Sequence, residues 1–137
     1  MLKEEMRSAA LAKRDAVDAD WRTRQSGRLA SFVDDLGFDD VTLVSGFLPI
    51  RSEIDLQPLM LALHDNGVPL CLPVVLDRET IIFRRYAPGM DLVDTGFGTR
   101  GPGPDVETVD PDVMLVPLAG FDDRGNRLGY GAGHYDR

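Results

Sequence analysis

The first third of the chain carries apolar residues at the spacing of α-helices. In residues 2–17 the apolar positions fall near one face and strong helix formers fill the rest, which predicts a helix; these positions are Leu2, Met6, Ala10 and Val17. A second helix is predicted from the apolar positions Trp21, Leu29, Phe32 and Leu36. Asp18 or Asp20 can cap its start, and Gly37 can end it, because glycine readily takes the left-handed conformation that closes a helix.

The rest of the chain carries continuous apolar runs typical of buried strands. The predicted strands are Val41–Phe47, Leu70–Val75, Thr80–Tyr86 and Val113–Leu118. Between the first two, residues 56–66 have helical spacing, with Asp55 as the N-cap and Gly67 as the stop. Helices alternating with apolar strands predict a single α/β domain over residues 1–137. Its sheet is expected to be mostly parallel and Rossmann-like, with helices on both faces.

Residues 87–111 interrupt this pattern. The segment is rich in glycine, proline and aspartate and has hardly any apolar periodicity. Long structureless segments in compact domains are usually functional flaps or disordered stretches. We therefore predict a mobile flap here.

Composition and charge narrow the classes of function. A net charge of −8 and a pI near 4.6 argue against nonspecific nucleic-acid binding, which needs a cationic surface. No apolar stretch reaches membrane-spanning length, and the N-terminus lacks the apolar core of a signal peptide. A single cysteine, Cys71, allows no disulfide within the chain and fits a reducing compartment. Because it lies in an apolar, strand-like run, we predict a buried structural thiol. We expect a soluble, cytoplasmic protein, and a monomer, although the sequence carries no direct signal of oligomeric state.

The segment Asn126–Arg137 combines glycines with polar side chains at high density. Gly129, Gly131 and Gly133 alternate, and glycine lets a backbone lie close against a ligand so that N–H groups converge on an anion. The accompanying arginines and carboxylate, which suit a phosphate chain and a metal, are Arg127, Arg137 and Asp136. The segment matches neither a Walker A sequence nor a dinucleotide fingerprint. It predicts a bound nucleoside triphosphate with magnesium, and a plain glycine turn is the alternative.

Two further groups of polar residues have a functional and a structural interpretation. Residues 48–55 follow the first predicted strand and carry Arg51, Ser52 and Glu53 to the sheet edge where α/β proteins bind ligands. Glu53 can equally serve the N-terminus of the following helix. Lys3 and Arg7 are four residues apart and project from one side of the first helix. They form either a solvated basic face or a pair of cations reaching a phosphate chain.

Four segments together resemble the 5-formyltetrahydrofolate cyclo-ligase family, also called methenyltetrahydrofolate synthetases. They are Lys3–Arg7, Phe47–Asp55, Leu115–Asp122 and Gly125–Arg137, in the family's order. The resemblance implies ATP-dependent, Mg²⁺-requiring closure of 5-formyltetrahydrofolate to 5,10-methenyltetrahydrofolate, with release of ADP and phosphate. It also implies a small-molecule substrate, and the charge and hydropathy of the chain predict no nucleic-acid or membrane partner.

The resemblance also assigns roles residue by residue. Lys3 and Arg7 would contact ATP phosphates, and Asp136 would ligate Mg²⁺. Leu48 and Glu53 would contact the folate, with Tyr130 and His134 on the substrate side of the glycine loop. Arg127 and Tyr130 would be the catalytic residues. The segment that wraps the triphosphate would comprise Arg127, Leu128, Gly129, Tyr130, Gly131, Ala132, Gly133, His134 and Tyr135.

Three departures from the family pattern leave alternatives open. His134 stands where many relatives carry tyrosine, and Gly98–Pro102 replaces a Gly-Ile-x-Glu-Pro type sequence. The family also continues beyond the glycine loop, so we expect a chain truncated at its C-terminus. A non-catalytic nucleotide- or folate-binding module of the same fold is therefore the alternative function. A related ligase acting on another formylated or amide substrate is a third.

Overall fold

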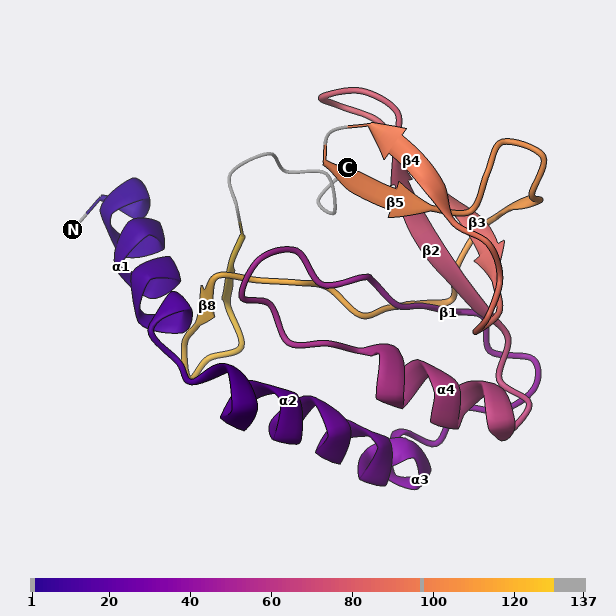
Figure 1. The fold of residues 1–137 in the computed structure, drawn as a ribbon, viewed down its shortest axis with the longest axis horizontal. Coiled ribbons are helices and arrows are strands. Elements are labelled where there is room, and N and C mark those ends of the chain that lie inside the picture. Colours follow the sequence, from indigo (N-terminus) through magenta and orange to yellow (C-terminus); the bar gives the residue numbers. More distant parts are fainter. Residues whose placement is uncertain (1, 97, 130–137) are drawn as a thin grey trace.

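A five-stranded sheet forms the centre of the molecule, seen in a computed structural model that describes residues 2–96 and 98–129 (Figure 1). The strand order is β6-β3-β2-β1-β7. These strands are β1 (Val44–Ser45), β2 (Leu70–Val75), β3 (Ile81–Tyr86), β6 (Thr108–Val109) and β7 (Val113–Met114). A parallel unit of β1, the helix α4 (Gln57–Asp65) and β2, with helices packed on the sheet, confirms the α/β class.

The sheet is mixed, with a parallel half and an antiparallel half. β1 pairs in parallel with both β2 and β7, whereas β3 pairs antiparallel with β2 and β6. The antiparallel half follows from the short connection between β2 and β3. Asp77 Oδ1 accepts hydrogen bonds from the backbone N–H groups of Glu79 and Thr80, both 2.8 Å. Parallel pairing needs a crossover of a dozen residues or more, so this tight turn produces a hairpin.

The helices lie close to their predicted ranges, although Leu56 and not the predicted Asp55 is the N-cap of α4. They are α1 (Lys3–Asp15), α2 (Ala19–Arg28), the 3-10 turn η1 (Leu29–Phe32), α3 (Val33–Leu36) and α4 (Gln57–Asp65). The Asp18 carboxylate accepts from Trp21 N (3.1 Å), and Gly37 ends α3 with φ 66°. The second helix, which the sequence predicts as one element, is divided by η1 into α2 and α3. No helix among the described residues is long and apolar enough to cross a membrane.

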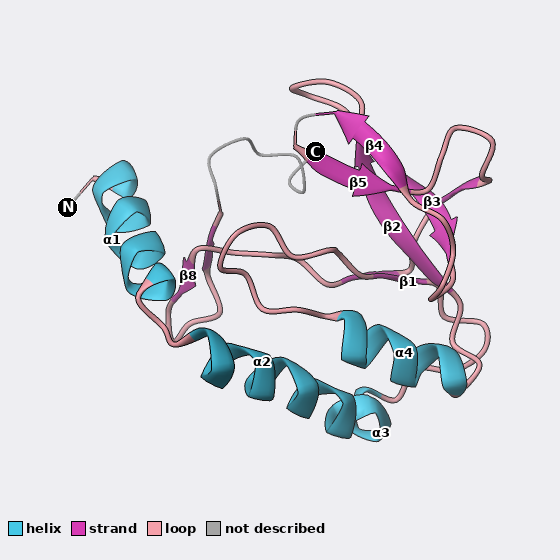
Figure 2. Ribbon diagram, in the orientation of Figure 1, coloured by secondary structure: helices cyan, strands magenta, loops and turns pink. Residues whose placement is uncertain are grey.

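The hydrophobic core joins α4 to the parallel strands. Leu59, Met60 and Leu63 of α4 are buried with Val44 of β1 and Leu70 of β2. Figure 2 shows α2, α3 and α4 gathered together, whereas α1 stands apart from them. No residue of α1 is buried. Hydrogen bonds from Arg7 to Gly129 and from Arg14 to Ser52 and Leu118 attach this helix to the rest of the molecule.

Two predicted strands are shorter than their apolar runs. β1 and β7 each contain two residues, and Val41 at the start of the first run is 78% exposed. Val41 and Thr42 belong instead to a turn in which Asp39 Oδ1 accepts from Val41 N (3.1 Å) and Thr42 Oγ1 (2.8 Å). The aspartate turn competes with strand pairing and wins at this position.

The expectation that residues 87–111 are structureless is wrong. The segment contains β4 (Val93–Gly96) and β5 (Thr99–Gly101), which pair antiparallel, and then β6. Thr95 and Thr99 hydroxyls lie 2.9 Å apart, and Asp94 Oδ1 accepts from Gly96 N (2.8 Å). β4, β5 and β6 are too short to show an apolar period in the sequence. Backbone pairing and contacts between threonine side chains stabilise the β4–β5 hairpin, and a wide apolar face is not needed.

Candidate functional site

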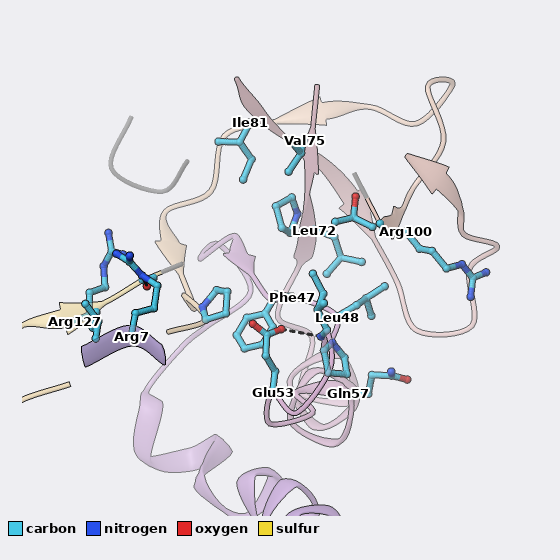
Figure 3. A pocket seen from close by; sticks show the side chains of 18 of the residues that line it. Arg7, Phe47, Leu48, Glu53, Gln57, Leu72, Val75, Ile81, Arg100 and Arg127 are labelled. Atoms are coloured by element: carbon cyan, nitrogen blue, oxygen red, sulfur yellow. Dashed lines mark hydrogen bonds between the residues drawn. The ribbon is translucent and has the colours of Figure 1, made fainter. Parts of the chain in front are cut away.

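A cleft of about 1210 Å³ opens between α1, the loop after β1, strands β2 and β3, and the β4–β5 hairpin. Figure 3 shows part of its lining. The apolar residues that line it are Phe47, Leu48, Pro49, Ile50, Leu72, Pro73, Val75, Ile81, Leu92, Pro117 and Leu128. The polar and charged ones are Lys3, Arg7, Glu53, Gln57, Tyr86, Thr99, Arg100, Asn126 and Arg127. An apolar cleft with a few polar groups at defined points is typical of a small-molecule site.

One end of the cleft is cationic. Lys3 and Arg7 come from α1, and Arg127 comes from β9 (Arg127–Leu128), which pairs with β8 (Gly120–Phe121). Arg7 Nε donates a hydrogen bond to the carbonyl oxygen of Gly129 at 2.7 Å. Figure 3 shows Arg7 and Arg127 side by side at this end. Three cations converging from two distant segments suit a polyanion.

The wall beside the cationic end contains a buried carboxylate. Glu53 is 6% exposed, and its Oε1 accepts from Ile50 N at 2.8 Å, as the dashed line in Figure 3 shows. Glu53 N in turn donates to the Ile50 carbonyl at 3.2 Å. Between them Arg51 has φ 57°, a left-handed conformation that costs a non-glycine residue free energy. The turn therefore presents the Glu53 carboxylate in a defined orientation.

Other parts of the cleft lining carry hydrogen-bonding groups from three elements. Gln57 begins α4, Arg100 lies in β5 and Tyr86 ends β3. Burial raises the pKa of the Tyr86 phenol, and the charge of Asp55 raises it further. The phenol therefore remains protonated and can donate a hydrogen bond. Arg100 Nη2 donates to the Leu92 carbonyl (3.4 Å) at the cleft rim.

Seven of the residues predicted as site residues line this one cleft. They are Lys3, Arg7, Leu48, Glu53, Arg127, Leu128 and Gly129. The other predicted residues lie outside the described part of the chain: Tyr130, Gly131, Ala132, Gly133, His134, Tyr135 and Asp136. Residues 2–96 and 98–129 contain no group of three or more His, Cys, Asp or Glu placed to hold a metal ion. The predicted roles remain predictions, but the described residues share one cavity.

Several cleft residues were not predicted from the sequence. Gln57, Tyr86 and Arg100 carry no motif, and each lies on an element predicted only for its secondary structure or as a flap. Tyr86 offered a weak signal, because a polar-tipped aromatic at a strand end is often placed at a ligand edge. Arg100 lies in the segment Gly98–Pro102, which departs from the family pattern, but its place in the cleft depends on the packing of the β4–β5 hairpin against β2.

A family model for the 5-formyltetrahydrofolate cyclo-ligase family matches residues 1–137 of this sequence. The chain belongs to that family. This is the family that the four sequence segments resemble.

Curated cyclo-ligases show the same relationship at moderate identity. The 5-formyltetrahydrofolate cyclo-ligase of Mycolicibacterium smegmatis is 34% identical over 144 residues, which cover 98% of this chain and 73% of that protein. The protein of the same name from Escherichia coli strain K12 is 38% identical over 100 residues, or 69% of this chain and 55% of that protein. The chain thus spans about half the length of the Escherichia coli relative.

Two solved structures from the family share the fold. A 5,10-methenyltetrahydrofolate synthetase from Aquifex aeolicus superposes with a TM-score of 0.79 at 33% identity, covering 100% of this chain and 71% of that one. The corresponding protein from Mycoplasma pneumoniae gives a TM-score of 0.76 at 24% identity, covering 100% of this chain and 76% of that one. The second likeness bears on the fold alone.

Proposed function

We propose that the protein closes 5-formyltetrahydrofolate to 5,10-methenyltetrahydrofolate at the expense of ATP. The observation that carries the proposal is the cleft itself, which has cations at one end, a buried carboxylate on its wall and an apolar lining. Family membership supports the reaction class. We further propose a cytoplasmic monomer that acts on this small molecule and not on nucleic acid or membranes.

The reaction needs the formyl oxygen to become a leaving group. In the proposed sequence that oxygen attacks the γ-phosphorus of ATP, the bond to the β-phosphate oxygen breaks, and ADP leaves. The folate N10 then attacks the activated carbon, the C–O bond breaks, phosphate departs and N10 loses its proton. Both reacting groups belong to one molecule, so ring closure benefits from proximity. The protein's contribution is alignment and charge stabilisation, as in other phosphoryl transfers.

The residues of the cleft fit these two tasks. Lys3, Arg7 and Arg127 would neutralise the triphosphate, with Arg127 and Tyr130 next to the transferred group. Leu48 would pack against the folate, and the Glu53 carboxylate would accept hydrogen bonds from it. Tyr130 and His134 would complete the substrate side. Leu128, Gly129 and the following glycine loop to Tyr135 would enclose the phosphates.

Magnesium enters the proposal only through the triphosphate. A bound Mg²⁺ would supply charge neutralisation on the phosphate oxygens. Asp136 is the predicted ligand and lies outside the described residues, whereas the described carboxylates form no metal-binding group. We expect Asp136→Ala to lose turnover at saturating Mg²⁺, and normal turnover of that variant would remove the metal assignment.

Turnover and binding measured together test the function. Purified protein would be given 5-formyltetrahydrofolate and ATP with Mg²⁺ while the methenyl product is followed by absorbance, and each ligand would be titrated calorimetrically. We expect turnover, and a fall of about 100-fold or more in kcat for Arg127→Ala, as for loss of a transition-state charge contact. Binding of both ligands without turnover would favour the non-catalytic module instead.

A neighbouring arginine provides the matched control. Arg124 is exposed, lies three residues before Arg127 and does not line the cleft. Arg124→Ala removes the same charge and should keep kcat within about twofold, because exposed charges away from a site contribute little. Equal losses in the two variants would mean that the general loss of positive charge, and not the cleft arginine, explains the effect.

A further inference from the structure

A polar cluster outside the cleft joins the end of α1 to the turn that carries Glu53. Arg14 Nε donates to Ser52 Oγ at 2.8 Å, and Ser52 Oγ donates to Asp15 Oδ1. Arg14 Nη1 also donates to the Leu118 carbonyl at 3.3 Å. None of these side chains lines the cleft. Three segments far apart in the sequence therefore meet at one hydroxyl and one guanidinium.

The Ser52 hydroxyl is held in a single orientation. Ser52 is 7% exposed, and its oxygen accepts one hydrogen bond from Arg14 while its proton goes to Asp15. A hydroxyl with both its donor and an acceptor site engaged cannot rotate without losing a contact. The cluster thus fixes the backbone at position 52, between the left-handed Arg51 and the buried Glu53.

The same helix also reaches the cationic end of the cleft. Two turns before Arg14, Arg7 donates to the Gly129 carbonyl at 2.7 Å. Leu118, which Arg14 contacts, immediately precedes the β8–β9 hairpin that carries Arg127. α1 is consequently attached at one point to the Glu53 turn and at two points to the segment that leads to the glycine loop. The distance between the Glu53 carboxylate and the cations depends on these attachments.

We infer that Arg14, Asp15 and Ser52 form a positioning cluster that sets the Glu53 carboxylate against the cationic end of the cleft. The inference rests on the proposed function, in which Glu53 holds the folate. Loss of the Ser52 hydroxyl keeps the Arg14 contact with Leu118 but lets the Glu53 turn relax toward conformations that a non-glycine Arg51 prefers, which moves the Glu53 carboxylate. The folate contact weakens as a result, whereas the phosphate contacts of Lys3 and Arg127 remain.

Ser52→Ala in the full-length protein tests the inference. We expect the KM for 5-formyltetrahydrofolate to rise about five- to tenfold, the loss typical of an oriented hydrogen-bond network, while the KM for ATP stays within about twofold. The control is Ser26→Ala. Ser26 is 3% exposed and its Oγ accepts from Asp55 N at 2.9 Å, so it holds the same loop two residues after Glu53, beyond the left-handed turn at Arg51. It should lower the unfolding midpoint without the folate-specific rise.

A second variant covers the case in which Ser52→Ala fails to fold. Arg14→Lys keeps the charge but not the forked donor that reaches both Ser52 and Leu118, so it should give a smaller rise in the same KM. Equal effects of Ser52→Ala and Ser26→Ala, or an unchanged folate KM in both Ser52→Ala and Arg14→Lys, would overturn the positioning role. A wild-type protein that neither binds nor turns over the folate would instead remove the proposed function, and with it this role.

Discussion

Cys71 lies within β2 with no exposed surface, opposite Arg85 of β3. Burial raises the pKa of its thiol to about 11. A thiol with so high a pKa is almost wholly protonated at neutral pH and is a poor nucleophile. The residue belongs to the packing of the sheet, in agreement with its prediction as a structural cysteine.

The reactivity of Cys71 follows directly. We expect the folded protein to resist alkylation by iodoacetamide at pH 8, with modification at least about tenfold slower than in denaturant, because only the thiolate reacts and it is buried. Mass spectrometry after timed quenching measures the rate. Since the folded pKa lies above the ordinary 9.0, the stabilising contribution of the neutral thiol is complete below pH 9 and is lost as pH rises toward 11. Rapid alkylation of native protein would contradict the burial.

The contribution of Asp122 to folding stability depends on pH in the opposite direction, because it is lost on acidification. Hydrogen bonds from the Asn126 side chain and backbone hold the pKa of Asp122 below its usual 3.8. Its contribution to stability is therefore present above about pH 3.8 and is lost as pH falls through the lower folded pKa. We expect the Asn126 amide resonances to shift toward unfolded values in that acidic range, ahead of the core. Asp122→Asn should remove this early step, and its persistence in that variant would assign the step to another carboxylate.

At the scale of elements, local chemistry predicts helices and tight turns better than sheet edges. Asp18 and Gly37 mark helix ends through contacts within a few residues, so the sequence alone locates them. β2 occupies the predicted residues 70–75, because β3 pairs with its whole length and β1 pairs with its first two residues. The β4–β5 hairpin was missed, since it forms through backbone pairing and contact with β2 that no local pattern records.

The contact between β1 and α4 offers a test at this scale. A Cβ at Gly46 would lie 2.2 Å from Met60 Sδ, and Met60 is 1% exposed. Gly46→Ala should therefore destabilise the fold by about 1–3 kcal/mol through overpacking, measured by urea unfolding. Adding Met60→Ala should cost less in the Gly46→Ala background than alone, because each change relieves the other.

Gly27→Ala is the control for that experiment. Gly27 lies within α2 with no atom within 4 Å of an added Cβ. Alanine there should leave stability unchanged or raise it by about 0.5–1 kcal/mol through helix propensity. A neutral Gly46→Ala would show that Met60 moves aside and that the β1–α4 contact tolerates an extra methyl group.

At the scale of the whole molecule, an acidic protein concentrates three cations at one end of a cleft. The net charge is −8, yet Lys3, Arg7 and Arg127 line the same cavity. Arg127 could be predicted because it lies in the dense glycine segment, whereas Lys3 and Arg7 were assigned to phosphate through the family resemblance. The sequence could not predict Gln57, Tyr86 or Arg100 beside them, since their meeting depends on the arrangement of β3, β5 and α4.

Substitution of Arg7 tests whether the cationic end of the cleft binds phosphate. Arg7→Ala removes a cation and its bond to the Gly129 carbonyl, and we expect ATP affinity to fall roughly tenfold or more by calorimetry. Lys13→Ala removes a cation from the same helix away from the cleft and should change affinity by less than about twofold. If both variants bound ATP like the wild type, the cationic end would not be the phosphate site.

The bond between Arg7 and Gly129 joins residues 122 positions apart. During synthesis the residues of α1 leave the ribosome long before the partner carbonyl of Gly129 is made. Contacts that close such long loops form late, because the entropy of bringing the ends together must be overcome first. The contact between Arg7 and Gly129 is therefore expected to form after the core that joins α4 to β1 and β2.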